Sequence, residues 1–477
     1  MPSTRLLADF AWLPNGFVPQ ASIALDGTPG DSRITAIDAN IVDSPGERVG
    51  RFVLPGLANI HSHAFQRLMA GLTERRALPA GSPASSAARD DDSFWTWRET
   101  MYAFASRIGP EDLRDIAAQV YVEMLKAGYT QVCEFHYLHN APDGQPYADP
   151  EAMSLALVEA ARDAGIGLTL LPVLYRTGGF DGRALSARQR RFGMPIDAFL
   201  RLFESLHPME SPLLRLGVAL HSLRAVSPDA LRAVVDALGG LATPIHIHVA
   251  EQLAEVQDCL ALRDARPVEW LLDNAPVDRR WCLVHATHMT AAETRRLAAS
   301  GAVAGLCPTT EANLGDGIFP LGAYLDSGGV FGVGSDSNVS VSPVEELRWL
   351  EYGQRLATHH RNVAARSPGG SSGEALWANA LRGGMQASGI AAFDPGRGAS
   401  GGTRPRADLV VLDDTSPLLA ERGPGNLLDS FLFAGNTRLV RDVMVAGEWR
   451  VRGFRHRDED AIAARFQRTV ARCMALP

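Results

Sequence analysis

The chain has 477 residues, of which 46% are hydrophobic and 21% charged, and its formal net charge is −8. This composition is typical of a soluble globular protein with a large buried core. Because no Lys/Arg-rich run stands out in the sequence and no apolar run is long enough to span a bilayer, we expect neither nucleic acid nor membrane as a partner.

The N-terminus and the cysteines indicate the compartment. Asp9 stands where a signal peptide would continue its apolar region, so no export signal is expected. The five cysteines are scattered, with no C-x-x-C spacing. Such sparse cysteines are typical of a reducing compartment without a disulfide framework. The sequence therefore predicts a cytoplasmic protein.

The two ends of the chain predict short β-strands. Residues 1–54 contain short alternating segments separated by turn residues, and residues 407–454 do the same, with a turn at Ala446-Gly447. We therefore expect residues 1–54 and 405–477 to form one small β-sandwich domain, with a helix at its C-terminal end. Residues 55–404 would be inserted between them as a second, larger domain.

The larger domain alternates strands and helices. Eight apolar, strand-like runs cover residues 52–63, 129–137, 167–175, 214–222, 244–251, 281–288, 302–308 and 330–337. Helical patterns with start and stop residues fall between them, at 110–128, 150–165, 227–240 and 290–301. This alternation predicts an α/β fold, a parallel (β/α)8 TIM-type barrel. A doubly wound open sheet is the alternative that alternation alone does not exclude.

Two segments rich in Gly, Ser and Pro, 78–92 and 366–374, predict surface loops. The first follows the strand that ends near His63. It is therefore either a mobile cover over a site at the end of that strand or an insertion without a function.

His61 and His63 lie at the end of the first barrel strand, in the sequence NIHSH. Side chains two residues apart on a strand point the same way, so both imidazoles would face one point. Two converging imidazoles are what a divalent transition metal takes as its first ligands. Two ordinary polar loop residues are the alternative for this pair taken alone.

Further imidazoles and carboxylates lie where the other strands end, which is the edge of a barrel that carries its chemistry. The residues at these ends are His61, His63, His136, Tyr137, Tyr175, His221, His246, His248, His285 and Asp336. Seven of the 13 histidines of the chain belong to this set. Any one of them could be a structural histidine, but random placement would not concentrate seven of them in this way.

The sequence PIHIHVAE offers two histidines on one strand face, so periodicity cannot choose between His246 and His248. Glu251 favours His248, because a carboxylate three residues after a metal ligand is placed to move protons beside the metal. His246 would then lie deeper in the barrel. The alternative role for Glu251 is a charge at a helix N-terminus.

Asp336 follows a buried strand directly, after the small residues Gly334 and Ser335. It could bind a metal and take a proton from water, since a divalent cation lowers the pKa of the water that it binds to roughly 7. His285 would hydrogen-bond that water or the developing oxyanion. His288 points elsewhere and is expected at a helix start.

With these residues in place, the chain resembles the amidohydrolase superfamily over most of its length. The resemblance implies that His61, His63, His248 and Asp336 hold one divalent metal ion, and that Glu251, His285 and Asp336 are the catalytic residues. It also implies the mononuclear subtype, because the fourth strand ends in LHSLR, with His221 and no lysine that could be carbamylated. That subtype points to deamination. Zinc is the expected ion, with Fe2+ or Mn2+ as alternatives.

Longer strings resemble one branch of that superfamily, the formimidoylglutamate deiminases of histidine degradation. They include IHSHAFQRLMAGLTE, SFWTWRETMY, YVEMLKAGYTQVCEFHYLH, HIHVAEQ, WCLVHATH, TEANLGDGIFP and GSDSNVSVSPVEELRWLEYGQR. The family often has His where this chain has Asn338. The resemblance implies metal-dependent hydrolysis of N-formimidoyl-L-glutamate to N-formyl-L-glutamate and ammonia, by a homodimer.

A dicarboxylate substrate calls for arginine forks and hydroxyl donors. The resemblance assigns substrate binding to Gln66, Arg98, Tyr137, His221 and Arg224. Two rival functions stay open at this point: deamination of a heterocycle such as guanine, and a non-catalytic scaffold that has lost its site. The second is disfavoured because all four expected ligands are present.

Overall fold

The computed structural model describes residues 4–13, 16–41, 44–74, 94–391 and 404–475. The predicted loop at 78–92 lies outside the described residues. In the part described, no helix is both long enough and apolar enough to cross a bilayer.

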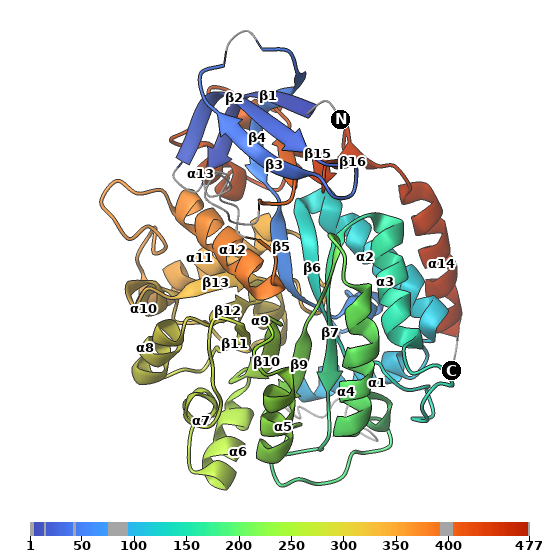
Figure 1. Cartoon of the computed structure of the whole chain (residues 1–477). Helices are drawn as coiled ribbons and strands as arrows, with labels where there is room; N and C mark the ends of the chain where they lie inside the picture. The colour runs from blue at the N-terminus through green and yellow to red at the C-terminus, as the bar shows by residue number, and fades with distance from the viewer. Residues whose placement is uncertain (1–3, 14–15, 42–43, 75–93, 392–403, 476–477) are drawn as a thin grey trace, which may run out of the picture.

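The larger domain is a closed parallel barrel (Figure 1). Its strands are β5 (Leu57–Ser62), β6 (Tyr129–His136), β7 (Gly167–Leu174), β8 (Leu214–Leu216), β9 (Val218–Ser222), β10 (Ile245–Val249), β11 (Trp281–His285), β12 (Val303–Leu306) and β13 (Val330–Val333). The sheet order is β6-β5-β13-β12-β11-β10-β9-β7-β8, and a further pairing of β6 with β7 closes the ring. The predicted TIM-type barrel is therefore confirmed, and the open-sheet alternative is excluded.

The run predicted at 214–222 is interrupted at Gly217, so β8 and β9 together fill one barrel position. A Cβ at this glycine would lie 2.4 Å from Cδ2 of Leu171 on β7. A side chain here would displace Leu171 and lie 3.0 Å from the Pro244 carbonyl oxygen.

Helices surround the barrel. They are α1 (Phe94–Ala105), α2 (Pro110–Ala127), α3 (Ala152–Ala164), α4 (Ile196–Leu206), α5 (Pro228–Leu238), α6 (Leu253–Arg263), α7 (Pro267–Asn274), α8 (Ala291–Ser300), α9 (Pro308–Leu314), α10 (Leu321–Asp326), α11 (Pro343–Thr358) and α12 (Ser372–Ser388). The four helices predicted from start and stop residues are α2, α3, α5 and α8. Their ends agree with capping chemistry: the Ser227 hydroxyl accepts from the Ala230 amide at 3.3 Å, and α2 ends at Gly128, with φ 106°.

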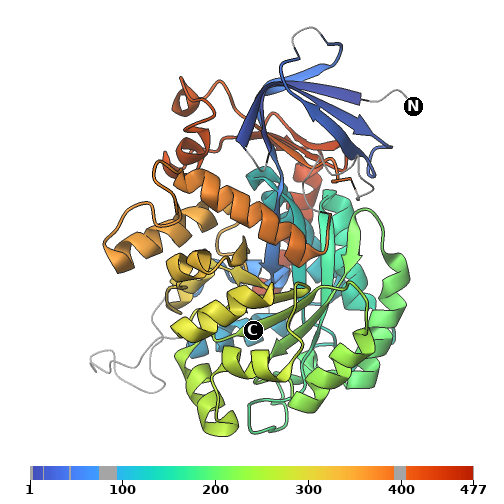
Figure 2. The ribbon, with the colours of Figure 1, turned by 60° about the vertical axis from the view of Figure 1, so that its left-hand side comes forward.

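Strands from both termini form one eight-stranded sheet at one end of the molecule (Figure 2). They are β1 (Thr4–Leu13), β2 (Gly16–Asp26), β3 (Arg33–Asp38), β4 (Glu47–Pro55), β14 (Leu409–Leu412), β15 (Val440–Val445), β16 (Glu448–Arg452) and β17 (Arg455–His456). The sheet order is β17-β16-β15-β14-β4-β1-β2-β3, so β4 and β14 join the two ends of the chain. The sheet domain made from both termini is confirmed, while its boundaries at 54/55 and 404/405 stay a prediction.

The first predicted barrel run, 52–63, is divided between the two sheets. β4 ends at Pro55 in the terminal sheet, and β5 begins at Leu57 in the barrel. Gly56 makes the change possible, because a Cβ there would lie 2.2 Å from Cγ2 of Thr130. The Gly56 amide donates to the Asp408 carbonyl at 3.1 Å. This bond ties the start of the first barrel strand to the terminal sheet.

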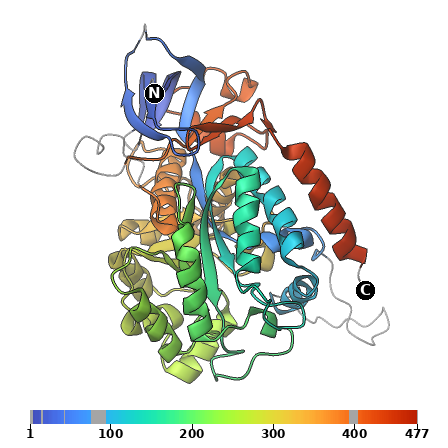
Figure 3. The same cartoon turned by 45° about the vertical axis from the view of Figure 1, so that its right-hand side comes forward.

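The C-terminal helix α14 (Glu459–Ala475) lies along the outside of the barrel beside α2 (Figure 3). Arg465 forms an ion pair with Asp115 of α2 at 3.1 Å, and the Thr469 hydroxyl donates to the same carboxylate at 3.0 Å. These contacts anchor α14 to α2 on the outside of the barrel.

Candidate active site

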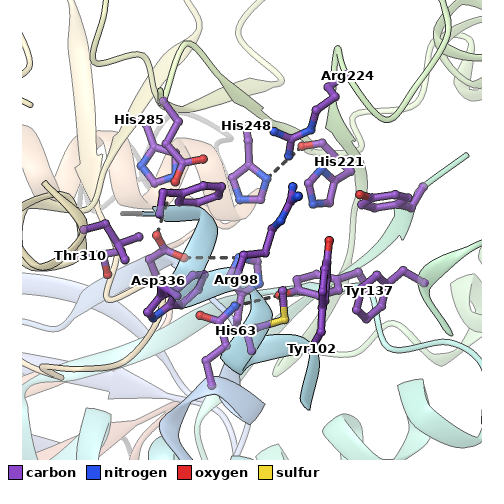
Figure 4. Close-up of a pocket in the computed structure, with 18 residues that line it drawn as sticks. His63, Arg98, Tyr102, Tyr137, His221, Arg224, His248, His285, Thr310 and Asp336 are labelled. Carbon is purple, nitrogen blue, oxygen red and sulfur yellow. Dashed lines mark hydrogen bonds and ion pairs between the residues drawn. The ribbon is translucent and has the colours of Figure 1, made fainter. Parts of the chain in front are cut away.

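The four predicted ligands meet at the C-terminal edge of the barrel, and Figure 4 shows three of them, His63, His248 and Asp336. His61 and His63 come from the end of β5, His248 from β10 and Asp336 from the turn after β13. The Nε2 atoms of His61 and His248 are 2.9 Å apart, and Asp336 Oδ1 lies 3.5 Å from Nε2 of His61 and 3.3 Å from Nε2 of His63. All four side chains are at most 8% exposed.

The donor set of this cluster fits a divalent cation. His63 and His248 use Nδ1 for the carbonyls of Phe135 and His221, both at 2.9 Å, which leaves each Nε2 free to bind a metal. Burial lowers the pKa of all three histidines, that of His61 to about 3, so the rings are neutral. Three neutral imidazoles and one carboxylate that face one another are a typical ligand set for zinc.

Asp336 reaches the cluster through close pairing of β5 with β13. The Asp336 amide donates to the His61 carbonyl and the His63 amide donates to the Asp336 carbonyl, both at 2.9 Å. A Cβ at Gly334 would lie 2.8 Å from the backbone of His61. The close approach of the Asp336 turn to β5 therefore requires glycine at position 334, a small residue that the sequence analysis expected to allow it.

Asn338 stabilises the same turn. Its side-chain amide donates to the Asp336 carbonyl at 3.0 Å and to the Ser62 hydroxyl at 3.3 Å, while its oxygen accepts from Ser335 at 2.6 Å. Asn338 has a left-handed backbone, with φ 57°. Asparagine adopts this conformation more readily than most residues, so it suits the position.

His285 lies between three carboxylates. Its Nε2 is 3.8 Å from both Glu251 and Asp336, and its Nδ1 is 3.3 Å from Glu311. Burial disfavours the charged ring, but the three carboxylates outweigh burial and raise the pKa of His285 to about 10. The ring can therefore carry a proton on Nε2 and present it to an oxygen in the pocket.

Glu251 follows β10 and is placed to exchange a proton. Burial, together with the nearby negative charge of Asp336, raises the pKa of Glu251 to about 7, although His285 opposes the shift. A carboxyl that titrates near neutral pH is suited to general acid–base work. Burial and Glu251 likewise raise the pKa of neighbouring Asp316 to about 9.

His246 is placed away from the cluster. It is fully buried, and its Nε2 contacts the Ala387 carbonyl at 2.8 Å. The choice of His248 over His246 therefore agrees with the geometry. His136 also lies outside the cluster, against His139, with ring centroids 5.0 Å apart.

A pocket extends from the cluster, and the five predicted substrate residues all line it. The Gln66 amide donates to the Tyr137 hydroxyl at 2.8 Å. His221 ends β9 and packs edge-on against Tyr175, with ring centroids 4.4 Å apart. These polar groups lie on one side of the candidate metal site.

Arg98 and Arg224 point toward the same space beside His221 (Figure 4). The Arg98 guanidinium lies 4.4 Å from the Trp95 ring centroid and 5.5 Å from that of Tyr102, and Arg224 lies 5.8 Å from the Trp95 ring. Burial and the charge of Arg224 lower the pKa of Arg98. Among the described residues, neither arginine forms an ion pair, so both charges are available to an anionic ligand.

Sequence reasoning missed four residues of the site: Tyr102, Thr310, Glu311 and Asp316. Glu311 lies on α9, one helical turn beyond the end of β12, and Asp316 follows that helix. Their string, TEANLGDGIFP, carries the resemblance without indicating which acid would face His285. The one feature of the sequence that could have indicated them is their position just after a predicted barrel strand. Functional residues of a barrel lie at the C-terminal ends of its strands.

Comparisons with known proteins agree with this geometry. Residues 52–371 match the model of the family described as the amidohydrolase family. The chain is 50% identical to a formimidoylglutamate deiminase from Pseudomonas aeruginosa, over 97% of this chain and 98% of that protein. It is 29% identical to an 8-oxoguanine deaminase from the same species, over 84% of this chain and 82% of that protein.

Among solved structures, an amidohydrolase from Brucella melitensis is similar throughout. Its TM-score is 0.89 and its sequence identity 45%, and the alignment covers 99% of this chain and 100% of that chain. The barrel, the terminal sheet and their arrangement are therefore shared with a protein of known structure.

Proposed function

This chain belongs to the amidohydrolase family, and from that premise we propose that it hydrolyses N-formimidoyl-L-glutamate to N-formyl-L-glutamate and ammonia. The relative at 50% identity supports the reaction. The main structural support for a dicarboxylate substrate is that Arg98 and Arg224 both line the pocket beside the candidate metal ligands. A substrate with two carboxylates and an amidine carbon needs both features.

His61, His63, His248 and Asp336 would hold one divalent cation, for which zinc is our first choice and Fe2+ or Mn2+ the alternatives. Such a cation supplies hydroxide from water at neutral pH, which is the nucleophile that an amidine carbon requires. Asp336 would use Oδ1 toward the cation. Its Oδ2, on the side of His285, would accept the proton of the attacking water.

Glu251 and His285 would each have one further role in the reaction. His285 would donate from Nε2 to the oxygen that becomes the formyl carbonyl, and so stabilise its developing charge. Glu251 would deliver a proton to the nitrogen that leaves as ammonia. One C–N bond of the amidine breaks, one C–O bond forms, and water supplies the oxygen.

Arg98 and Arg224 would bind the two carboxylates, with Gln66, Tyr137 and His221 as further polar contacts. Charge-assisted bonds to two carboxylates orient the amidine end toward the metal site. A planar heterocycle would leave both guanidinium charges unmatched. This mismatch favours the linear dicarboxylate over a purine, although one relative is an 8-oxoguanine deaminase.

Ammonia release by the zinc-loaded protein tests this function. We expect turnover of N-formimidoyl-L-glutamate with kcat/KM at least 10³-fold above that for 8-oxoguanine or guanine. Faster release from either purine would contradict the proposal. The homodimer and the cytoplasmic location stay predictions, which light scattering and cell fractionation can test.

A further inference from the structure

A second cavity opens at the same edge of the barrel. It lies between the segment after β6 and the segment after β7, and its volume is about 410 Å³. Its polar lining comes from His139, Asn140, Tyr147, Tyr175, Arg176 and Arg190. Tyr175 also lines the active-site pocket, so the two spaces share one lining residue. No residue of this cavity takes part in the proposed reaction.

The segment between β7 and α4 is strongly basic. Residues 176–193 contain five arginines and one aspartate, in a chain whose net charge is −8. Three of these arginines have protein partners: Arg183 pairs with Asp181, Arg188 with Glu99, and Arg191 donates to the Ala105 and Ile108 carbonyls. Arg176 and Arg190 line the cavity and form no ion pair with a described residue.

The cavity wall contains no compensating charge. Among the described residues, neither an aspartate nor a glutamate lines it. Its other surface is apolar, from Leu185, Met194 and Ala198. The charge and the apolar wall together select a ligand with an anionic group on a short hydrocarbon chain.

Hydrogen bonds hold the backbone at Arg176 and Arg190 in place. The Asn140 side-chain amide donates to the carbonyls of Arg190 and Gly193 at 2.9 and 2.8 Å, and the Asn140 amide donates to the Arg191 carbonyl at 3.0 Å. The Arg176 amide donates to the Ala225 carbonyl at 2.8 Å. Both arginines have exposed side chains, and these bonds hold the backbone from which each side chain extends.

We propose that this cavity is a second binding site for a small carboxylate, with Arg176 and Arg190 as its anion-binding residues. A short dicarboxylate, the class to which the proposed substrate and product belong, fits both its charge and its apolar wall. The ligand would then be held beside Tyr175, next to the catalytic pocket. The proposal does not require that the protein be a deiminase, because it concerns binding alone.

Calorimetric titration with glutarate, a dicarboxylate without a hydrolysable group, tests the site. We expect the wild-type chain to bind two equivalents, one in each cavity. The double variant Arg176→Gln/Arg190→Gln should bind one equivalent, and Arg98→Gln/Arg224→Gln should bind only the other. Binding of one equivalent by the wild type, or of two by the Arg176/Arg190 variant, would overturn the proposal.

Arg183→Gln is the matched control, because it removes the same charge from the same segment at a residue that does not line the cavity. It should still bind two equivalents. If it loses one, general attraction by the basic segment accounts for the effect, and the cavity is not the site. Inorganic phosphate should bind the second cavity at least tenfold more weakly than glutarate; equal affinity would contradict a site for a carboxylate on a hydrocarbon chain.

Discussion

The Nε2 atoms of His61 on β5 and His248 on β10 lie 2.9 Å apart, although β13, β12 and β11 separate these two strands in the sheet. The contact spans the barrel mouth, where side chains from opposite strands converge. The His221 carbonyl orients the His248 ring through its Nδ1. Closure of the barrel therefore assembles the candidate metal site.

Glu251 should be essential for turnover but not for metal binding. Glu251→Gln keeps the shape of the side chain and removes its proton exchange, so we expect kcat to fall by about 10²–10⁴-fold. Metal content should equal that of wild type by elemental analysis. Asp258→Asn, which removes a charge from an exposed position on α6, should keep wild-type kcat. A kcat within twofold of wild type for Glu251→Gln would exclude Glu251 as the proton carrier.

The two pocket arginines should determine affinity for a dicarboxylate. Arg98→Gln and Arg224→Gln each remove charge-assisted hydrogen bonds, and we expect each to raise KM at least tenfold, since such bonds contribute about 1.5–3 kcal/mol. Exposed Arg382→Gln on α12 is the control for lost positive charge. Initial rates over a range of substrate concentrations give the values. Unchanged KM in both pocket variants would remove the argument for a dianionic substrate.

Glu311 should position His285 without touching the substrate. Its Oε1 faces His285 Nδ1 at 3.3 Å and accepts the Cys307 amide at 3.0 Å. Glu311→Ala removes the acceptor that orients the ring, so kcat should fall about tenfold or more while KM changes less than twofold. Glu311→Gln keeps an acceptor oxygen and should recover part of the loss. Equal kcat values for the two variants would argue against orientation by this oxygen.

Stability should fall in mild acid partly because of His139. Burial lowers the pKa of His139 to about 4, while the unfolded chain binds this proton near pH 6.5. Because the unfolded state takes up the proton first, the free energy of unfolding decreases as the pH falls from 6.5 to 4, by about 3 kcal/mol from this residue.

His139→Gln should reduce that slope, since glutamine can still donate to the Val173 carbonyl, which His139 Nε2 contacts at 2.9 Å, and does not titrate. Urea unfolding at several pH values measures it. Exposed His360→Gln is the control and should keep the wild-type slope. An unchanged slope in His139→Gln would show that this histidine does not contribute.

The repeating parts of the fold could be predicted from the sequence. Apolar runs and helix caps such as Ser227 identified the barrel strands and four of its helices, because periodicity and capping are local properties. The passage from β4 to β5 was not predictable, since both strands are apolar and the change of sheet depends on contacts of Gly56 with Thr130 and Asp408.

The candidate site could likewise be predicted only in part, because some of its contacts depend on how distant segments pack. The candidate ligands stand at strand ends, where topology alone brings them together, and so His61, His63 and Asp336 could be named in advance. Glu311 could not, because it reaches His285 from a helix that follows another strand. Likewise, the stacking of Arg98 and Arg224 around Trp95 depends on how α1 lies across the pocket.

A cation bound by three imidazoles and one aspartate is the centre of this account. The most direct measurement is an anomalous difference map at the zinc edge, from crystals of the zinc-loaded protein. We predict one peak per chain, about 2.0–2.2 Å from Nε2 of His61, His63 and His248 and from an Asp336 oxygen. No peak there, or a single peak among His285, Cys307 and Glu311, the other buried group able to hold a metal in the described chain, would contradict it.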